Sequence, residues 1–385
     1  MRRALVALGH RVAALGQGRR PGPVHVNLPF REPLVPRAAC EGEAASDGEN
    51  VSDGEKAPEA KDPYHDVHAS PRPPAILSRL PKGLQERLRG RGLIYCGPDN
   101  SRPGFPAAVL RCAAALGVPV LADPLSELRF LSDPRFGQGT RTDFAQVATT
   151  NSGQGVASAG SPSPLITRYK SLVRNPAAAR ALRPDWVLRF GRAPISRTVL
   201  EWLPGIPLIL VDPAERWSDP AHDLALPDSL HLDLDPIALC MTLATSPPTP
   251  ADPDWLALWT RAEACLASLA TNCLVQAPWC EAHLIADLVS QIPAGEGLLC
   301  ANSLPIRQFE TWAGTRNAPL TVFGNRGLSG IDGQLSTLAG HNAAGLPTTG
   351  LLGDLSFLHD LSGLLLAREL PRPCILVNNG GGRIV

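Results

Sequence analysis

The stretch from Gly350 to Val385 constrains the fold most, because it alternates apolar runs with polar turns at the spacing of a βαβ unit. Residues 349–352 predict a buried strand that stops at a Gly-Asp turn, and leucines then recur at helical spacing over 358–366. Prolines end this expected helix, and 374–377 predicts a second strand, closed by an Asn-Asn-Gly-Gly-Gly run. Since a helix joins the two strands, they are expected to be parallel.

Hard oxygen ligands follow both of these strands. Asp354 lies in the first turn, and Asn379 follows the second strand. Because the carboxyl ends of neighbouring parallel strands face one crevice, we expect these side chains to lie side by side. A carboxylate, an amide oxygen and a carbonyl near Gly381 suit octahedral Mg²⁺, and the amides that open the helix at Ser356 suit a phosphate. The pattern indicates a site for magnesium diphosphate, whereas the Gly-Asp pair alone would equally describe an ordinary strand-to-helix turn.

Composition excludes several classes of partner. The chain has 385 residues, 44% of them hydrophobic, which is enough for two or three domains with real cores. Its 36 basic and 36 acidic residues balance, so nothing indicates nucleic acid or an acidic membrane surface as a partner. Nine cysteines without a Cys-x-x-Cys pair favour a reducing, cytoplasmic location. No apolar run reaches the length of a membrane span, and the N-terminal stretch is amphipathic, unlike a signal peptide.

Shifts in composition divide the chain into four parts. They are 1–35, with one helix and one strand from the end of an α/β domain; 36–72, an acidic linker; 73–248, a central α/β domain; and 249–385, a last α/β domain. The linker has almost no large apolar residue and is expected to be disordered, with His65 and His68 as solvated spacers in preference to metal ligands. A stretch rich in Ser, Thr and Gly, 137–164, is expected to be a mobile surface insertion.

Short apolar runs alternate with helical stretches in both α/β domains, which predicts doubly wound parallel sheets. The expected strands are 93–96, 118–121, 186–190 and 208–211 in the central domain, and 298–300 and 321–323 in the last. No spaced glycines of the dinucleotide fingerprint open a helix in the central domain, so independent NAD binding is not expected.

Two arginines follow strands of the last domain. Arg307 comes after the strand at 298–300, and Arg326 after the strand at 321–323. Both are therefore expected at the edge that carries Asp354. Guanidinium groups pair bidentately with carboxylates, so the pair could clamp an acidic substrate. The alternative is that each arginine caps or bridges surface structure.

The Gly-Asp turn and the Asn-Asn pair together resemble the signature of thiamine-diphosphate-dependent enzymes, although Leu355 stands where most of that family has glycine. The run 20–34, the segments 122–126 and 189–197, and the loops containing Arg307 and Arg326 are similar to one subfamily. This subfamily is the menaquinone-pathway synthases that make 2-succinyl-5-enolpyruvyl-6-hydroxy-3-cyclohexene-1-carboxylate. The resemblance covers nearly the whole chain except the two low-complexity stretches.

The resemblance implies a thiamine-diphosphate-binding fold with a central Rossmann-like domain. Residues 1–35 would be the C-terminal remnant of the pyrimidine-binding domain, and 249–385 the N-terminal part of the diphosphate-binding domain. The implied transferase activity is decarboxylation of 2-oxoglutarate and addition of the resulting carbanion to isochorismate, with thiamine diphosphate and Mg²⁺ or Mn²⁺, in a homodimer or homotetramer. Alternatives are another thiamine carboligase, such as an acetohydroxyacid synthase, and a non-catalytic α/β binding module.

The resemblance also implies roles for individual residues. Substrate binding is implied for Arg307, Arg326 and Arg197, the last of which could equally be a solvent-exposed helix cation. Cofactor contacts are implied for Ser303, Ser329, Ile331 (as the apolar brace), Gly353, Leu355, Ser356 and Gly382. Metal ligation is implied for Asp354, Asn379 and Gly381. The family's catalytic glutamate would lie before residue 1, so the chain is expected to be an internal piece that does not turn over alone.

Overall fold

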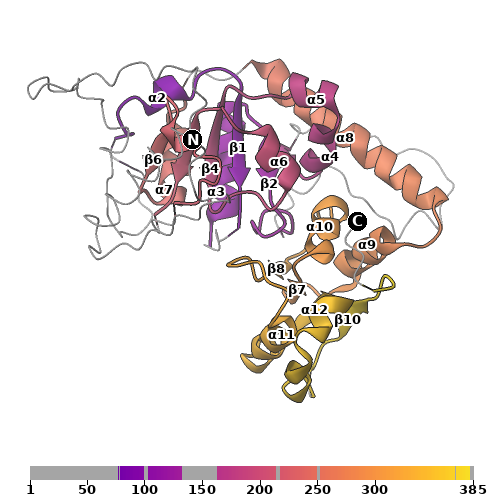
Figure 1. Ribbon diagram of the computed structural model, residues 1–385. Helices are drawn as coiled ribbons and strands as arrows, with labels where there is room; N and C mark the ends of the chain where they lie inside the picture. The colour runs from indigo at the N-terminus through magenta and orange to yellow at the C-terminus, as the bar shows by residue number, and fades with distance from the viewer. Residues whose placement is uncertain are drawn as a thin grey trace, which may run out of the picture. The chain divides into compact units, whose positions relative to one another are not determined.

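The computed structural model describes residues 77, 79–98, 103–131, 163–213, 217–248, 252–368 and 370–381 (Figure 1). All of them belong to one compact unit, Val67–Val385. The expectations for 1–35 and 36–72, for the insertion up to residue 162, and for Gly382 fall outside the described residues. No described helix is both long and apolar enough to cross a membrane.

The first sheet has six strands in the order β3-β2-β1-β4-β5-β6, and all of its pairings are parallel. This order belongs to doubly wound, Rossmann-like sheets, so the predicted class is confirmed. The strands are β1 (Gly92–Cys96), β2 (Val120–Ala122), β3 (Leu165–Ile166), β4 (Trp186–Phe190), β5 (Leu208–Val211) and β6 (Leu230–Leu232). Nearly every strand residue is buried, because helices and neighbouring segments cover both faces.

Most helices of this region occupy the crossovers between strands; the first precedes β1 and the last follows β6. They are α2 (Leu84–Arg87), α3 (Phe105–Leu116), α4 (Tyr169–Arg174), α5 (Pro176–Ala181), α6 (Arg197–Trp202), the 3₁₀ turn η1 (Asp223–Ala225) and α7 (Pro236–Thr245). Helices α3 and α7 pack against each other and against the sheet in one apolar core. At the switch point of the strand order, a Cβ on Gly97 would come within 2.0 Å of the carbonyl oxygen of Arg192, so the loops after β1 and β4 meet directly.

The second sheet has four parallel strands in the order β10-β9-β7-β8. They are β7 (Gly297–Cys300), β8 (Thr321–Phe323), β9 (Thr348–Gly353) and β10 (Cys374–Val377). The helices that follow the first sheet in sequence begin with α8 (Pro253–Gln276), which contacts β3 and α4 of the first sheet's region. Those of the second sheet are α9 (Glu281–Gln291), α10 (Leu304–Trp312), α11 (Gln334–Ala343), α12 (Asp354–Leu358) and the 3₁₀ turn η2 (Leu361–Leu365). Leu298 packs on the side of α9 and α10, whereas the next residue, Leu299, packs on the side of α11. The sheet is thus covered on both faces.

Two expectations differ from the structure. The single helix expected over 358–366 is instead α12 and η2, because the buried Asp360 between them accepts hydrogen bonds from the amide and the hydroxyl of Ser336 (2.6 and 2.9 Å). Pro164, the last residue of the expected mobile insertion, is buried, and its carbonyl oxygen accepts a hydrogen bond of 2.8 Å from the amide of Val120. Pro164 is therefore hydrogen-bonded to the first sheet, whereas it was expected to belong to the mobile insertion.

Candidate functional site

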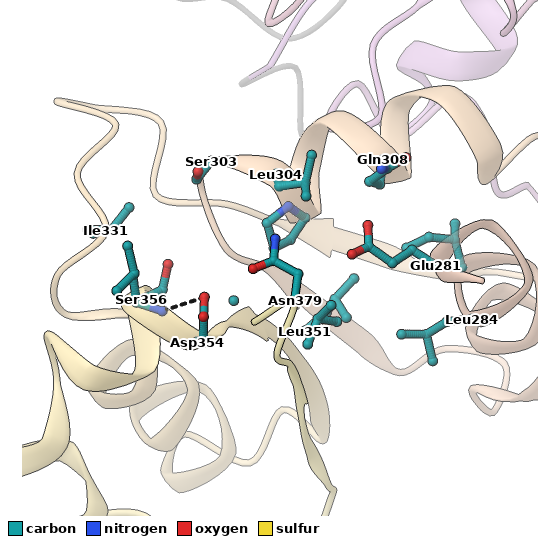
Figure 2. A pocket seen from close by; sticks show the side chains of 15 residues that line it. Glu281, Leu284, Ser303, Leu304, Gln308, Ile331, Leu351, Asp354, Ser356 and Asn379 are labelled. Carbon is teal, nitrogen blue, oxygen red and sulfur yellow. Dashed lines mark hydrogen bonds between the residues drawn. The ribbon is translucent and has the colours of Figure 1, made fainter. Parts of the chain in front are cut away.

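A cavity open to solvent lies at the carboxyl edge of the second sheet (Figure 2). Its walls come from α9, the start of α10, the loop before α11, and the ends of β9 and β10. The lining residues are Glu281, Leu284, Ile285, Ser303, Leu304, Pro305, Gln308, Ile331, Leu351, Gly353, Asp354, Leu355, Ser356, Val377 and Asn379. Apolar side chains form most of the wall; Asp354, Ser356 and Asn379 lie near one another toward one end, whereas Glu281 and Gln308 lie toward the other.

Asp354 and Asn379 line this cavity together, as the sequence predicted for their positions. Their proximity follows from the strand register, in which Gly353 of β9 is paired with Val377 of β10. Strands β9 and β10 thus end at the same level of the sheet. Asp354 Oδ1 accepts a hydrogen bond of 2.9 Å from the amide of Leu355, drawn as a dashed line in Figure 2.

The donors at this end of the cavity fit a hard cation. A carboxylate and an amide supply the oxygen ligands that Mg²⁺ and Mn²⁺ prefer. Within the described part of the chain, no three His, Cys, Asp or Glu side chains gather in a group that could hold a metal. The predicted set contains only one such residue, Asp354, so this absence does not bear on it. The ligand roles of Asp354, Asn379 and Gly381 stay predictions.

Two of the predicted serines have backbone conformations that are rare for residues with a side chain. Ser303, at the start of α10, has φ 72°, and Ser329, in the loop after β8, has φ 60°. Such conformations are costly and gather at functional sites. Ser303 and Ile331 line the cavity, whereas Ser329 is exposed and does not.

Arg326 is half-buried in the loop after β8. Its Nη1 donates a hydrogen bond of 2.8 Å to the side-chain oxygen of Asn302, which follows β7. Burial lowers the pKa of the Arg326 guanidinium, the charge of Asp123 opposes this shift, and the charge of Arg307 adds to it. The two arginines therefore influence each other electrostatically, although neither lines the cavity.

Arg307 and Arg197 are both exposed. Lys170 Nζ donates a hydrogen bond of 3.1 Å to the backbone carbonyl of Arg307 on α10. The side chain of Arg197 is 90% exposed and pairs with Glu201 one turn along α6, at 2.6 Å. The alternative of a solvent-exposed helix cation describes Arg197 well, and its substrate role stays a prediction.

Sequence reasoning missed several residues of this region. Glu281 and Gln308 place polar side chains in the cavity wall, and Leu284 and Ile285 supply part of its apolar surface. The signal for the α9 residues is topological, because a helix that precedes a parallel strand begins at the carboxyl edge of the sheet. Asn302 was not singled out either, yet it is buried and connects two loops.

Comparisons with known proteins give one consistent name. No family model matches the chain. A 2-succinyl-5-enolpyruvyl-6-hydroxy-3-cyclohexene-1-carboxylate synthase from Geobacillus kaustophilus is 36% identical over 94% of this chain and 56% of its own length. A synthase of the same name from Chloroflexus aurantiacus is 35% identical over 97% of this chain and 58% of its own length. The resemblance found in the sequence is thus confirmed, and the chain spans little more than half the length of these relatives.

One solved structure is also similar. It is a protein from Mycobacterium smegmatis described as a thiamin diphosphate-dependent enzyme, with a TM-score of 0.42, 16% identity, and coverage of 78% of this chain and 53% of that one.

Proposed function

We propose that this chain binds thiamine diphosphate and the acidic substrates of 2-succinyl-5-enolpyruvyl-6-hydroxy-3-cyclohexene-1-carboxylate synthases. It is a homologue of these enzymes over nearly all of its length. The reaction is decarboxylation of 2-oxoglutarate and transfer of the remaining fragment to isochorismate. The observation that supports it most is that Asp354 and Asn379, the two side chains of the cofactor signature, line one cavity. The proposal includes Mg²⁺ or Mn²⁺ as the ion, a homodimer or homotetramer as the assembly, and the cytoplasm as the location.

The end of the cavity with Asp354 and Asn379 would hold the metal diphosphate. Asp354, Asn379 and the carbonyl of Gly381 would ligate the ion, and the hydroxyl and amide of the buried Ser356 would contact the diphosphate. When bound, thiamine diphosphate supplies the electron sink that decarboxylation of a 2-oxo acid requires. The apolar wall, including Ile331 and Leu355, would orient its rings and exclude water.

The arginines would supply substrate recognition. Arg326 is partly desolvated, so its charge is less screened than a surface charge and attracts a carboxylate more strongly. Arg307 adds a second positive charge at the same edge. Both substrates of the proposed reaction are polycarboxylates. Two cationic side chains pair better with such substrates than with a neutral one.

Calorimetry with thiamine diphosphate and Mg²⁺ tests the cofactor half of the proposal. The wild-type chain is expected to bind, and Asp354→Ala should weaken binding roughly 100-fold or more because an anionic metal ligand is lost. Asp287→Ala is the matched control, since this carboxylate is exposed on α9 and does not line the cavity. A wild-type chain that binds no cofactor, or equal loss in both variants, would contradict the proposal.

Titration of the cofactor-loaded chain with 2-oxo acids tests the substrate half. We expect 2-oxoglutarate to bind and pyruvate, which lacks the second carboxylate, to bind at least about 10-fold more weakly. A preference for pyruvate would instead support an acetohydroxyacid synthase.

A further inference from the structure

Asn302 uses its whole side-chain amide to join two loops at the carboxyl edge of the second sheet. It follows β7 and is 1% exposed. Its Nδ2 donates to the backbone oxygens of Asn325 and Gly330, each at 2.7 Å. Its Oδ1 accepts the hydrogen bond from Arg326 Nη1 at 2.8 Å. One side chain therefore fixes both ends of the segment 325–330 and the guanidinium within it.

We propose that Asn302 is a positioning residue that locks the segment 325–330 and orients the Arg326 guanidinium toward a substrate carboxylate. The substrate part of this inference rests on the proposed function. The lock itself rests only on the three hydrogen bonds and the burial of Asn302.

Only an amide satisfies these partners. The two backbone oxygens need N–H donors, and Arg326 needs an acceptor. Aspartate at this position would place an oxygen against at least one backbone oxygen, and an aliphatic residue would leave all three groups without this partner. Because Asn302 is buried, water does not easily replace what it supplies.

The neutrality of Asn302 matters for the charge of Arg326. Among the described residues, no Asp or Glu forms an ion pair with Arg326, although the charges of Asp123 and Glu310 act on it from further away. The guanidinium is thus held by a neutral acceptor and keeps its positive charge uncompensated at short range. A substrate carboxylate can then form the close, charge-assisted pair.

A second contact supports the same segment from the first sheet. Arg192 Nη1, from the loop after β4, donates to the backbone oxygen of Arg326 at 3.3 Å. This contact holds the backbone of Arg326, whereas Asn302 holds its side chain. The contact with Arg192 does not depend on Asn302, so loss of Asn302 should loosen the segment and reorient the guanidinium while this one backbone contact remains.

The test compares Asn302→Asp and Asn302→Ala with the matched variant Asn342→Ala. Asn342 also joins backbone groups through its amide, donating to the oxygens of Leu338 (2.9 Å) and Thr348 (3.0 Å) and accepting from the amide of Thr348 (3.0 Å). It lies on α11 and contacts the amino end of β9, at the opposite edge of the sheet. It therefore reports the cost of losing such a side chain away from the site.

Hydrogen exchange on the ligand-free chain measures the lock. Both Asn302 variants should exchange the backbone amide of Arg326, which donates to the carbonyl oxygen of Gly324 at 2.8 Å, at least about 10-fold faster than the wild type, because the segment opens more often. Asn342→Ala should leave exchange of this amide unchanged. Unchanged exchange of the Arg326 amide in the Asn302 variants would overturn the lock.

Binding of 2-oxoglutarate to the chain loaded with thiamine diphosphate and Mg²⁺ measures the orientation. Asn302→Ala should raise its Kd about 10-fold or more while changing the Kd of the cofactor by less than about 3-fold. In an Arg326→Ala background, Asn302→Ala should have no further effect, because it acts through Arg326. An equal effect in that background would overturn the orientation. If the wild type binds neither the cofactor nor 2-oxoglutarate, both the proposed function and the role of Asn302 in substrate binding are wrong. Hydrogen exchange then tests only whether Asn302 holds the segment 325–330.

Discussion

Ser303 carries backbone strain that a single substitution can release. Its φ of 72° and ψ of −129° are easily reached by glycine but not by a residue with a Cβ. Strain of this kind costs roughly 1–3 kcal/mol. We expect Ser303→Gly to raise the free energy of unfolding by about 1 kcal/mol, after the extra entropy of glycine in the unfolded chain. Ser303→Ala, which removes the hydroxyl but keeps the Cβ, should give no such gain in urea denaturation; equal results for both would contradict the strain.

The two interpretations of Arg197, a substrate-binding residue or a solvent-exposed helix cation, predict different effects when its side chain is removed. Its side chain is 90% exposed and contacts Glu201 on the same helix. Arg197→Ala should therefore leave thermal stability unchanged, since exposed ion pairs contribute little. If the residue has a substrate role, the Kd of isochorismate should rise in the same variant. The control is Glu201→Ala, which breaks the same ion pair but keeps the arginine. If the Kd of isochorismate does not change in Arg197→Ala, the residue is a surface cation without a substrate role.

At the scale of elements, a buried carboxylate helps to attach α8 to the first sheet. Glu263 accepts hydrogen bonds from the amide and hydroxyl of Thr167 (3.2 and 2.8 Å), just after β3, and from the amide of Arg168 (3.0 Å), whose guanidinium pairs with it at 3.0 Å. Glu263→Ala would leave these groups buried without their partner. We expect a loss of about 3 kcal/mol or more in the free energy of unfolding, measured by denaturant titration. Exposed Glu86→Ala on α2 serves as the control and should change little; a similar loss in both would contradict the role of Glu263.

The elements show how far periodicity carries a prediction. Strands β4, β5, β8 and β10 match the expected bounds, because each is an apolar run of three to five residues bounded by breakers. Strands β3 and β6 were not predicted, since β3 has only two residues and His231 interrupts the apolar residues of β6, and because their pairing depends on neighbours distant in sequence. The break between α12 and η2 was also unpredictable, because Asp360 is drawn to Ser336 by tertiary contact.

At the scale of the whole molecule, Asp123 links stability to pH. It is fully buried after β2 and accepts hydrogen bonds from the Tyr95 hydroxyl (3.0 Å) and the amides of Leu125 (3.0 Å) and Ile195 (3.3 Å). Burial, and then the charge of Glu310, raise its pKa from 3.8 to about 6. The folded state therefore favours the protonated carboxyl, and this contribution to stability is full below about pH 4 and is lost as pH rises through about 6.

This pH dependence should disappear with the carboxyl. A rise of the pKa from 3.8 to about 6 corresponds to about 3 kcal/mol of unfolding free energy lost across that window. The difference in stability between Asp123→Asn and the wild type should therefore change by up to this amount between pH 4 and pH 7, as measured by urea titration at each pH. A constant difference between the two proteins would show that Asp123 does not titrate in this range.

The part of the candidate site that could be predicted is the set of residues placed by the order of the strands. Asp354 and Asn379 follow paired strands, so their shared place in the cavity wall needed only the βαβ rule. The structure does not bring Arg307 and Arg326 into that wall. Arg307 lies on α10, and the direction of the Arg326 side chain, which leaves a loop, depends on its partner Asn302. Nothing in the sequence marks that partnership, since Asn302 differs from other loop asparagines only by what it meets in space.

The parallel pairing of both sheets also has a kinetic consequence. Strand β1, near the middle of its sheet, pairs with β2 on one side and with β4 on the other. On the ribosome, β2 is complete at Ala122, but β4 begins only at Trp186. At typical translation speeds this interval lasts on the order of several seconds, during which one edge of an apolar strand has no partner. Chaperone binding to nascent chains should therefore concentrate in this window and fall once residue 190 has emerged.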